Sequence, residues 1–217
     1  MPDNTHPDHS AAGGIVIHST TLTPSKEEII SAFMGRPRTV IGSWRLADPE
    51  GHVGIEGIIS RADKTRFEQV PVSYRSEELD PEHTLATTEH GVLGTRYVTN
   101  AHADAVAVRE ILRLIIEGGD GPAWESSKEV MTLHSVGSEN LTWDPDSVTI
   151  DKTTSQHCYG HVNIGGQLRS FKLYTPRNLT TANYAVTGHQ VSAHRIEGEL
   201  PSAPGKRLIV AELALLD

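Results

Sequence analysis

One stretch of the chain, residues 70–98, constrains the fold more than any other because its pattern changes within a short distance. It opens with Val70, Val72 and Tyr74 alternating with other residues, which is the two-residue period of a half-buried strand. The acidic residues 76–84 that follow contain a proline, which donates no ladder hydrogen bond and interrupts a strand. The pattern therefore predicts a strand that ends near residue 75 and is followed by an exposed loop.

The next segment, residues 89–94, contains Gly91 and Gly94. Glycine takes a positive φ more readily than any other residue, so the spacing predicts a tight turn. We expect this turn to return the chain to an apolar surface. In that arrangement Glu89 and His90 pack against the turn.

Composition excludes several classes of protein. A chain of 217 residues with 37% hydrophobic content can bury a real core. The formal net charge of -9 argues against sequence-independent binding to nucleic acid, which needs clustered lysine and arginine. Cys158 is the single cysteine, so an intramolecular disulfide is impossible and a reducing compartment is favoured.

The polar N-terminus, residues 1–14, lacks the positive start and the apolar core of a secretory signal, and we expect it to be a disordered lead. Apolar runs elsewhere fall short of the roughly 20 residues that cross a bilayer. These observations predict a soluble, cytoplasmic protein without a membrane segment.

Periodicity predicts the regular elements of the first half. Thr23 and Pro24 resemble a helix start, and the helix that follows has Ile29, Ile30 and Phe33 on one face. A second helix, residues 104–117, carries a longer apolar stripe at i, i+3, i+4 and i+7. The expected strands between the helices are residues 39–46, 53–60 and 66–74, arranged as an antiparallel meander.

The second half is predicted to be mainly antiparallel β structure. Residues 119–127 are rich in glycine and form the best candidate linker. The expected strands beyond it are residues 130–136, 148–153, 157–164, 167–174, 185–194 and 207–215. The sequence thus predicts an α+β subdomain over residues 15–118, with a curved antiparallel sheet and flanking helices, and a β subdomain over residues 128–217.

Two motifs carry a family resemblance. Residues 70–75 read VPVSYR and residues 89–98 read EHGVLGTRYV. They resemble the N-terminal cap subdomain of actinobacterial maltokinases, whose patterns run V-P-L-[ST]-Y-R and E-H-x-V-L-G-x-R-[WY]-V. The likeness covers residues 17–118, although Tyr97 stands where tryptophan is usual and residues 99–104 replace an Asp-rich loop.

The resemblance implies a cystatin-like sheet wrapped by a helix. It also implies a non-catalytic accessory module in maltose, trehalose or glycogen metabolism, without the kinase body that would supply the ATP site. The chain contains neither a P-loop motif nor a dinucleotide-binding motif, and we expect no cofactor.

The sharpest group of polar residues comprises Glu56, Arg75, Glu89, His90 and Arg96. The favoured interpretation is structural: Arg75, Glu89, His90 and Arg96 form a buried, satisfied network that joins strand, loop and turn. The alternative is acid–base chemistry by Glu56, Glu89 and His90 in a pocket on the curved sheet.

Two histidines are weak candidates for metal ligands. His157 and His161 share a strand face but lie roughly 13 Å apart, so a metal site would need a third ligand and a bend. Hydrogen-bonded histidines are the favoured interpretation, and no metal is expected. Cys158, which lies between them, is expected to be a small buried hydrophobe and not a nucleophile.

Two functions remain open on this sequence. The first is a non-catalytic accessory or interaction protein that binds a protein partner through exposed loops, chiefly residues 76–84 and 99–104. The second is a small enzyme or ligand-binding protein. A homodimer is compatible with both.

Overall fold

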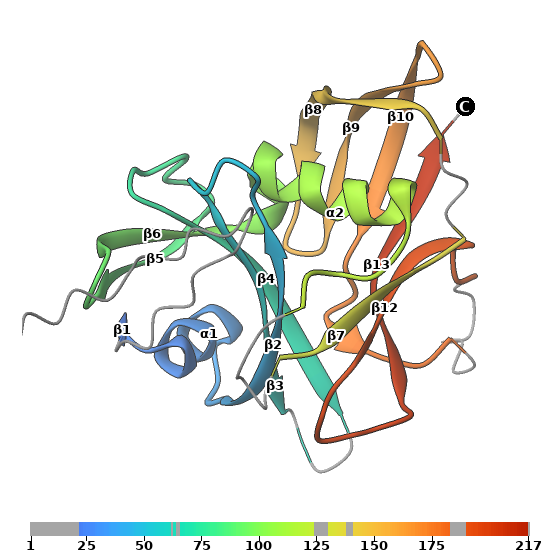
Figure 1. The fold of residues 1–217 in the computed structure, drawn as a ribbon. Coiled ribbons are helices and arrows are strands. Elements are labelled where there is room, and N and C mark those ends of the chain that lie inside the picture. The colour runs from blue at the N-terminus through green and yellow to red at the C-terminus, as the bar shows by residue number, and fades with distance from the viewer. Residues whose placement is uncertain are drawn as a thin grey trace, which may run out of the picture.

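In the residues that the structure describes, two antiparallel sheets, two α-helices and one short 3-10 helix make up the fold (Figure 1). The computed structural model describes residues 22–61, 63, 66–123, 130–137, 141–182 and 190–216. The expected disordered lead, residues 1–14, lies outside the described residues, as do residues 124–127 of the expected linker. Neither helix in the described chain has the length and apolar composition needed to cross a membrane.

The first half holds sheet A and all the helical elements of the described chain. Its elements are β1 (Leu22–Thr23), α1 (Lys26–Met34), β2 (Thr39–Ala47), β3 (Gly54–Arg61), β4 (Phe67–Arg75), β5 (Thr84–His90), β6 (Gly94–Asn100), the 3-10 helix η1 (Ala101–Ala103) and α2 (Ala105–Glu117). The strands lie in the order β1-β5-β6-β4-β3-β2. The expected meander β2-β3-β4 is confirmed.

The second half holds sheet B. Its elements are β7 (Thr132–Val136), β8 (Trp143–Thr153), β9 (His157–Ile164), β10 (Gln167–Tyr174), β11 (Asn178–Leu179), β12 (His194–Glu199) and β13 (Arg207–Leu216). The strand order is β7-β12-β13-β10-β9-β8, while β11 crosses to pair with β4 of sheet A. The expected strands 157–164 and 167–174 are confirmed with their glycine turn.

The strand expected at residues 185–194 is wrong in its described part. Residues 190–193 are irregular, and β12 begins only at His194. Residues 185–189 lie outside the described chain. Ser192 breaks the ladder there, because its backbone N–H donates to the carboxylate of Glu212 at 2.6 Å and its hydroxyl donates to the carbonyl of Leu213.

Helix α1 begins two residues later than the sequence predicts. Ser25, and not Thr23, is the N-cap, and its hydroxyl and the carboxylate of Glu28 form a capping box. Ile29 and Ile30 are buried as expected, but Phe33 is 37% exposed at the end of the helix. The sheet curls around this helix in Figure 1 and covers only one side of it.

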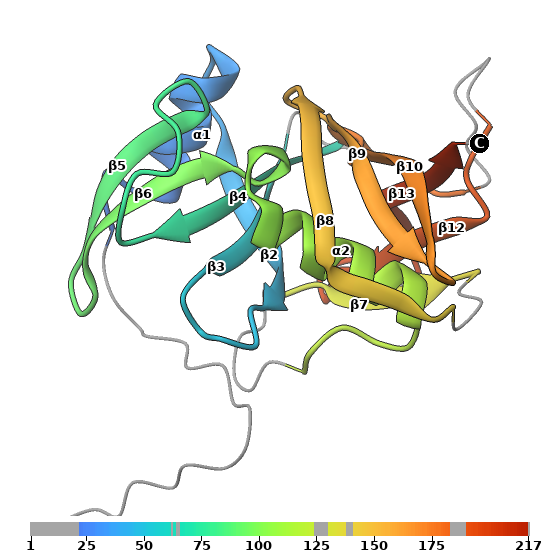
Figure 2. The same ribbon diagram turned by 90° about the horizontal axis from the view of Figure 1, so that it is seen from above.

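Residues from both halves of the chain build most of the hydrophobic core together. A single hydrophobic cluster contains Trp44 of β2, Ile111 of α2, Phe171 of β10 and Leu213 of β13. Helix α2 lies between the two sheets, as Figure 2 shows. A smaller cluster joins α1 to the opposite face of sheet A. The core is therefore not divided at residues 119–127.

Gln69 links the two sheets through polar contacts in this core. Its side-chain oxygen accepts a hydrogen bond from the indole of Trp44 at 2.7 Å. Its amide nitrogen donates to the backbone carbonyls of Pro176 at 2.9 Å and Val210 at 2.8 Å. Because a buried polar group is costly when unpaired, the bond to Val210 of β13, supported by the bonds to Trp44 and Pro176, holds sheet B at a defined position against sheet A.

Candidate functional site

Glu56 is the best-connected of the polar residues singled out in the sequence. It lies on β3 with only 4% exposure, on the face that α1 covers. Lys26 of α1 donates to Oε1 at 2.6 Å, Arg45 of β2 donates to the same oxygen at 3.2 Å, and the Tyr74 hydroxyl donates to Oε2 at 2.9 Å. Both of its carboxylate oxygens therefore accept hydrogen bonds inside the protein.

The charges around Glu56 control its ionisation. Burial alone raises the pKa of its carboxyl, but Lys26 and Arg45 outweigh burial, so the pKa lies below its ordinary value. Burial and then the negative charge of Glu56 raise the pKa of Tyr74 well above its ordinary value. At neutral pH the pair is therefore a carboxylate and a neutral phenol, joined by a charge-assisted hydrogen bond.

Glu89 lies far from Glu56 in the sheet. It belongs to β5, and β6 and β4 separate that strand from β3. Its side chain is exposed and accepts a hydrogen bond from the Thr95 hydroxyl at 2.8 Å. The expected burial of Glu89, and its expected pairing with Arg75 or Arg96, are wrong, because the β5–β6 hairpin extends beyond the region that the core covers.

His90 organises the turn at the end of this hairpin. Its Nδ1 accepts from the backbone N–H groups of Val92 at 3.3 Å and Leu93 at 3.0 Å. Gly94 has the expected positive φ of 70°, but the turn does not return to an apolar surface, since Val92 and Leu93 are 60% and 44% exposed. Glu56, Glu89 and His90 thus do not meet in one pocket.

Arg75 has a different partner from the one expected. Its Nε and Nη2 donate to the two carboxylate oxygens of Asp104, each at 2.7 Å. Asp104 is fully buried and also caps α2 by accepting from the backbone N–H of Val106. Although burial raises the pKa of Asp104, the bonds from Arg75 and its neighbours lower it below its ordinary value. Arg96 instead donates to the backbone carbonyl of Thr95.

The sequence contains a signal for the role of Asp104 as a helix cap. Asp104 stands immediately before the apolar stripe of α2, which is the position of a helix N-cap. That position predicts the capping of α2 by Asp104. It does not predict the ion pair with Arg75, because Arg75 is distant in sequence and reaches Asp104 only through the β4–β6 pairing.

Residues 99–104 are not the exposed binding loop that the sequence predicts. Thr99, Ala101, His102 and Asp104 are at most 1% exposed. The segment forms η1 and lies in contact with strands of both sheets. Asn100, His102 and Asp104 pair inside the protein, which accounts for most of a hydrophilic sequence at a buried position, whereas the Thr99 hydroxyl is buried without a hydrogen-bond partner among the described residues.

His102 is the centre of that buried segment. Its Nδ1 lies 3.0 Å from the side-chain oxygen of Asn100, and its Nε2 lies 2.8 Å from the Thr175 hydroxyl. The side-chain nitrogen of Asn100 donates to the carbonyl of Thr154, which leaves its oxygen as an acceptor. Nδ1 therefore carries the proton, and Nε2 accepts from Thr175.

We expect acid to destabilise the protein through His102. Burial, together with His157, lowers the pKa of His102 to about 3, against 6.5 for an unperturbed histidine. Below pH 6.5 the unfolded chain takes up this proton and the folded chain does not, so stability present above pH 6.5 is lost as the pH falls toward 3. The expected loss is about 1.4 kcal/mol per pH unit in this range.

Chemical denaturation between pH 7 and 5 measures this slope before most carboxylates titrate. His102→Gln should flatten it. His52→Gln is the matched control, because the side chain of His52 is 77% exposed, and it should leave the slope unchanged. A His102→Gln variant with the wild-type slope would contradict the assignment.

The histidines of β9 have separate partners. His157 stacks on Tyr174 with ring centroids 4.6 Å apart, and Nδ1 of His161 lies 2.9 Å from a carboxylate oxygen of Asp151. Among the described residues, no three histidine, cysteine or acidic side chains are grouped as a metal site would require. Cys158 is buried, and its pKa is raised to about 12, so its thiol is protonated at neutral pH.

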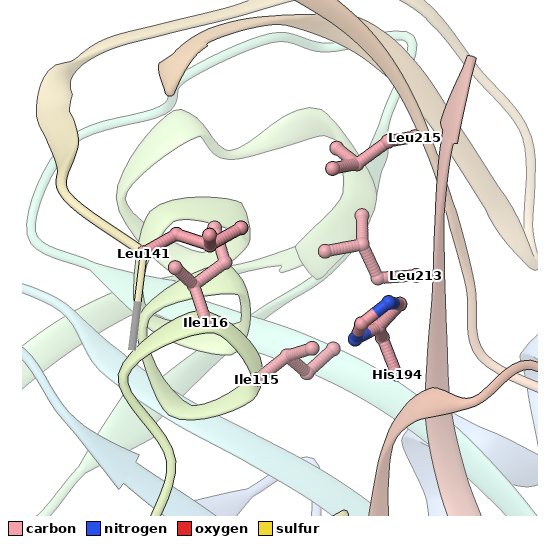
Figure 3. Close-up of a pocket in the computed structure, with 6 residues that line it drawn as sticks. All are labelled: Ile115, Ile116, Leu141, His194, Leu213 and Leu215. Atoms are coloured by element: carbon pink, nitrogen blue, oxygen red, sulfur yellow. The ribbon is translucent and has the colours of Figure 1, made fainter. Parts of the chain in front are cut away.

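A small apolar pocket lies between α2 and sheet B (Figure 3). Its volume is about 40 Å³, well below the several hundred Å³ of typical ligand pockets. His194 contributes its only ionisable lining group, and that ring bonds the carbonyl of Gly137. None of Glu56, Glu89 and His90 lines it. The lining residues are Ile115, Ile116, Leu141, His194, Leu213 and Leu215.

The segment that runs from the end of α1 to Asp104 holds β2 to β6, η1 and both family motifs. Residues 32–104 match the maltokinase N-terminal cap domain. The cap-domain match confirms the resemblance over a narrower range than residues 17–118, and it covers less than half of the chain. Glu56, Arg75, Glu89, His90 and Asp104 all lie inside it. No curated protein matches the chain.

Proposed function

We propose that this protein is a non-catalytic accessory module that binds a protein partner through the tip of the β5–β6 hairpin. The observation that supports this proposal is the exposure of two adjacent aliphatic residues, Val92 and Leu93, on a turn that His90 holds in shape. Figure 1 shows the hairpin at the outer end of sheet A, away from sheet B. Exposed apolar side chains on a pre-organised turn suit insertion into an apolar pocket of a partner.

The class of partner enzyme in this proposal is suggested by the match to the maltokinase cap domain. Since residues 32–104 match a maltokinase cap domain, we propose an enzyme of maltose, trehalose or glycogen metabolism as the partner, in the cytoplasm of an actinobacterium. The cystatin-like description of the cap is part of the same proposal. It is compatible with a curled antiparallel sheet around α1.

A second candidate function is acid–base chemistry at Glu56. It is favoured by one observation, a buried carboxylate within hydrogen-bonding distance of both Lys26 and Tyr74. It has less support than partner binding, because Glu89 and His90 lie elsewhere and Glu56 has its charge balanced by Lys26 and Arg45. Such balance is typical of structural ion pairs.

Affinity capture from an extract of the native cell tests the first proposal. The bait is the purified protein, and the variant Val92→Asp with Leu93→Asp places two charges on the hairpin tip. We expect capture of a sugar-metabolism enzyme to fall by about tenfold or more, since interface anchors carry most of the binding energy.

Leu168→Asp is the matched control, because Leu168 is 68% exposed and lies in β10 of sheet B, outside the sheet that carries the hairpin. It should capture the same enzyme as wild type. Equal capture by the hairpin variant would place binding elsewhere. Loss of activity on a sugar substrate in a folded Glu56→Gln variant that still captures the partner would favour the enzyme alternative.

A further inference from the structure

The two ends of strand β4 carry opposite charge. Beyond Arg75 the chain enters the loop of residues 76–83, called here the acidic loop, which contains Glu77, Glu78, Asp80 and Glu82. The loop is mostly exposed, and Leu79 in its middle is 43% exposed. It therefore presents one aliphatic side chain surrounded by carboxylates.

The other end of β4 is surrounded by cations, although the whole chain has a net charge of -9. This basic end consists of the residues that contact Phe67, Glu68 or the last turn of α1: Phe33, Arg36, Arg38, Arg61, Arg177 and Lys206. Nearby Arg66 is paired with Asp63, and Glu27 bonds the backbone of Val40. Cations thus remain in excess here.

The outer surface of the basic end has the geometry to receive carboxylates. The side chain of Arg36 is 59% exposed and uses a single nitrogen, Nη2, to contact Glu68 at 3.0 Å. Because most of this side chain is exposed, a carboxylate from outside can approach it, and an arginine fork binds carboxylates well. The guanidinium of Arg177 lies 5.4 Å from the centroid of the Phe33 ring, so a cation and an exposed aromatic ring stand side by side.

We propose that this protein associates with itself head to tail, with the acidic loop of one copy bound to the basic end of the next. The two surfaces match in kind: Leu79 packs on Phe33, while Glu77 and Glu78 approach Arg36 and Arg177. This proposal is independent of the hairpin function, which uses the tip at Val92 and Leu93.

The two surfaces cannot pair within one copy. They lie at opposite ends of the nine-residue strand β4, which corresponds to about 25 Å at the rise of a β-strand. A contact between two different surfaces of identical chains is heterologous, so it adds copies without closing into a two-fold dimer. Because exposed ion pairs are weak and screened by salt, the association is reversible and strongest at low ionic strength.

Sedimentation of the purified protein tests this proposal. At about 0.01 M salt, where the Debye length is about 30 Å, the average mass should rise with concentration beyond twice the 23.6 kDa of one chain. At about 1 M salt, where the Debye length is about 3 Å, the protein should return to single chains. A wild-type protein that stays a single chain at low salt overturns the proposal.

Two variants and their mixture identify the surfaces. The loop variant carries Glu77→Lys, Glu78→Lys and Leu79→Ser, and the end variant carries Phe33→Ser and Arg36→Ser. Each alone should remain a single chain, but a mixture should form pairs and nothing larger, because each variant keeps one intact surface. Mixtures that stay single, or that grow beyond pairs, contradict head-to-tail contact.

The control variants distinguish self-association from partner binding through the hairpin tip. Val92→Asp with Leu93→Asp should associate as wild type does, and loss of association in that variant overturns the proposal. Each variant must keep the wild-type unfolding temperature. If the end variant unfolds, Arg61→Glu with Lys206→Glu replaces it, since both side chains lie at the same end over the Phe67 ring.

Discussion

Replacing Asp104 with alanine is expected to lower the free energy of unfolding by about 4 kcal/mol. Its carboxylate is fully buried, accepts two bonds from Arg75 and caps α2 through Val106. Removal leaves the guanidinium of Arg75 without its counter-charge, and it leaves the first turn of α2 without a cap. Both losses act on the helix that packs between the two sheets.

Urea unfolding followed by circular dichroism measures this change. Asp104→Asn should lose less, because the amide oxygen still accepts from Val106 and from one nitrogen of Arg75. Asp63→Ala is the matched control: Asp63 also bonds an arginine, Arg66, but its side chain is 40% exposed, so the cost should stay below about 1 kcal/mol. An equally small loss in Asp104→Ala would show that the pair contributes little.

Removing residues 128–217 is expected to abolish cooperative folding of the remaining chain. The sequence predicts two subdomains, but Trp44, Leu46 and Ile111 share one hydrophobic cluster with Phe171 and Leu213. Without sheet B these side chains are exposed to water, at roughly 25 cal/mol for each Å² of apolar surface.

Thermal unfolding of the chain 1–127 measures this effect. We expect no sharp transition and a tendency to aggregate. Co-expression with residues 128–217 is the control, and it should restore a soluble complex that unfolds cooperatively. A chain 1–127 that unfolds cooperatively by itself would instead establish residues 15–118 as an independent subdomain.

The hydrogen-bond partners of Glu56 could not be predicted from the sequence. Glu56 stands among apolar strand residues, and it lies within both the predicted likeness of residues 17–118 and the cap-domain match. Its contacts with Lys26, Arg45 and Tyr74 come from three other elements. They depend on how α1 lies across the sheet, and no local pattern encodes that placement.

Elements whose apolar residues recur with a strong period are predictable from the sequence alone. Residues 157–164 and 167–174 form strands as predicted, and α2 buries Val108, Ile111, Leu112 and Ile115 as its stripe requires. The physical reason is that one apolar face must be buried whatever partner covers it, so the period of the pattern specifies the backbone conformation.

The contacts between polar side chains depend on the assembled fold. Residues 99–104 are hydrophilic yet buried, while Glu89 is exposed although it lies beside turn glycines. Arg75 pairs with Asp104 and not with Glu89, because the strand order brings η1 and the start of α2 to the end of β4. Charged side chains can pair with any opposite charge in reach, so their partners follow from the assembled sheets and not from the local sequence.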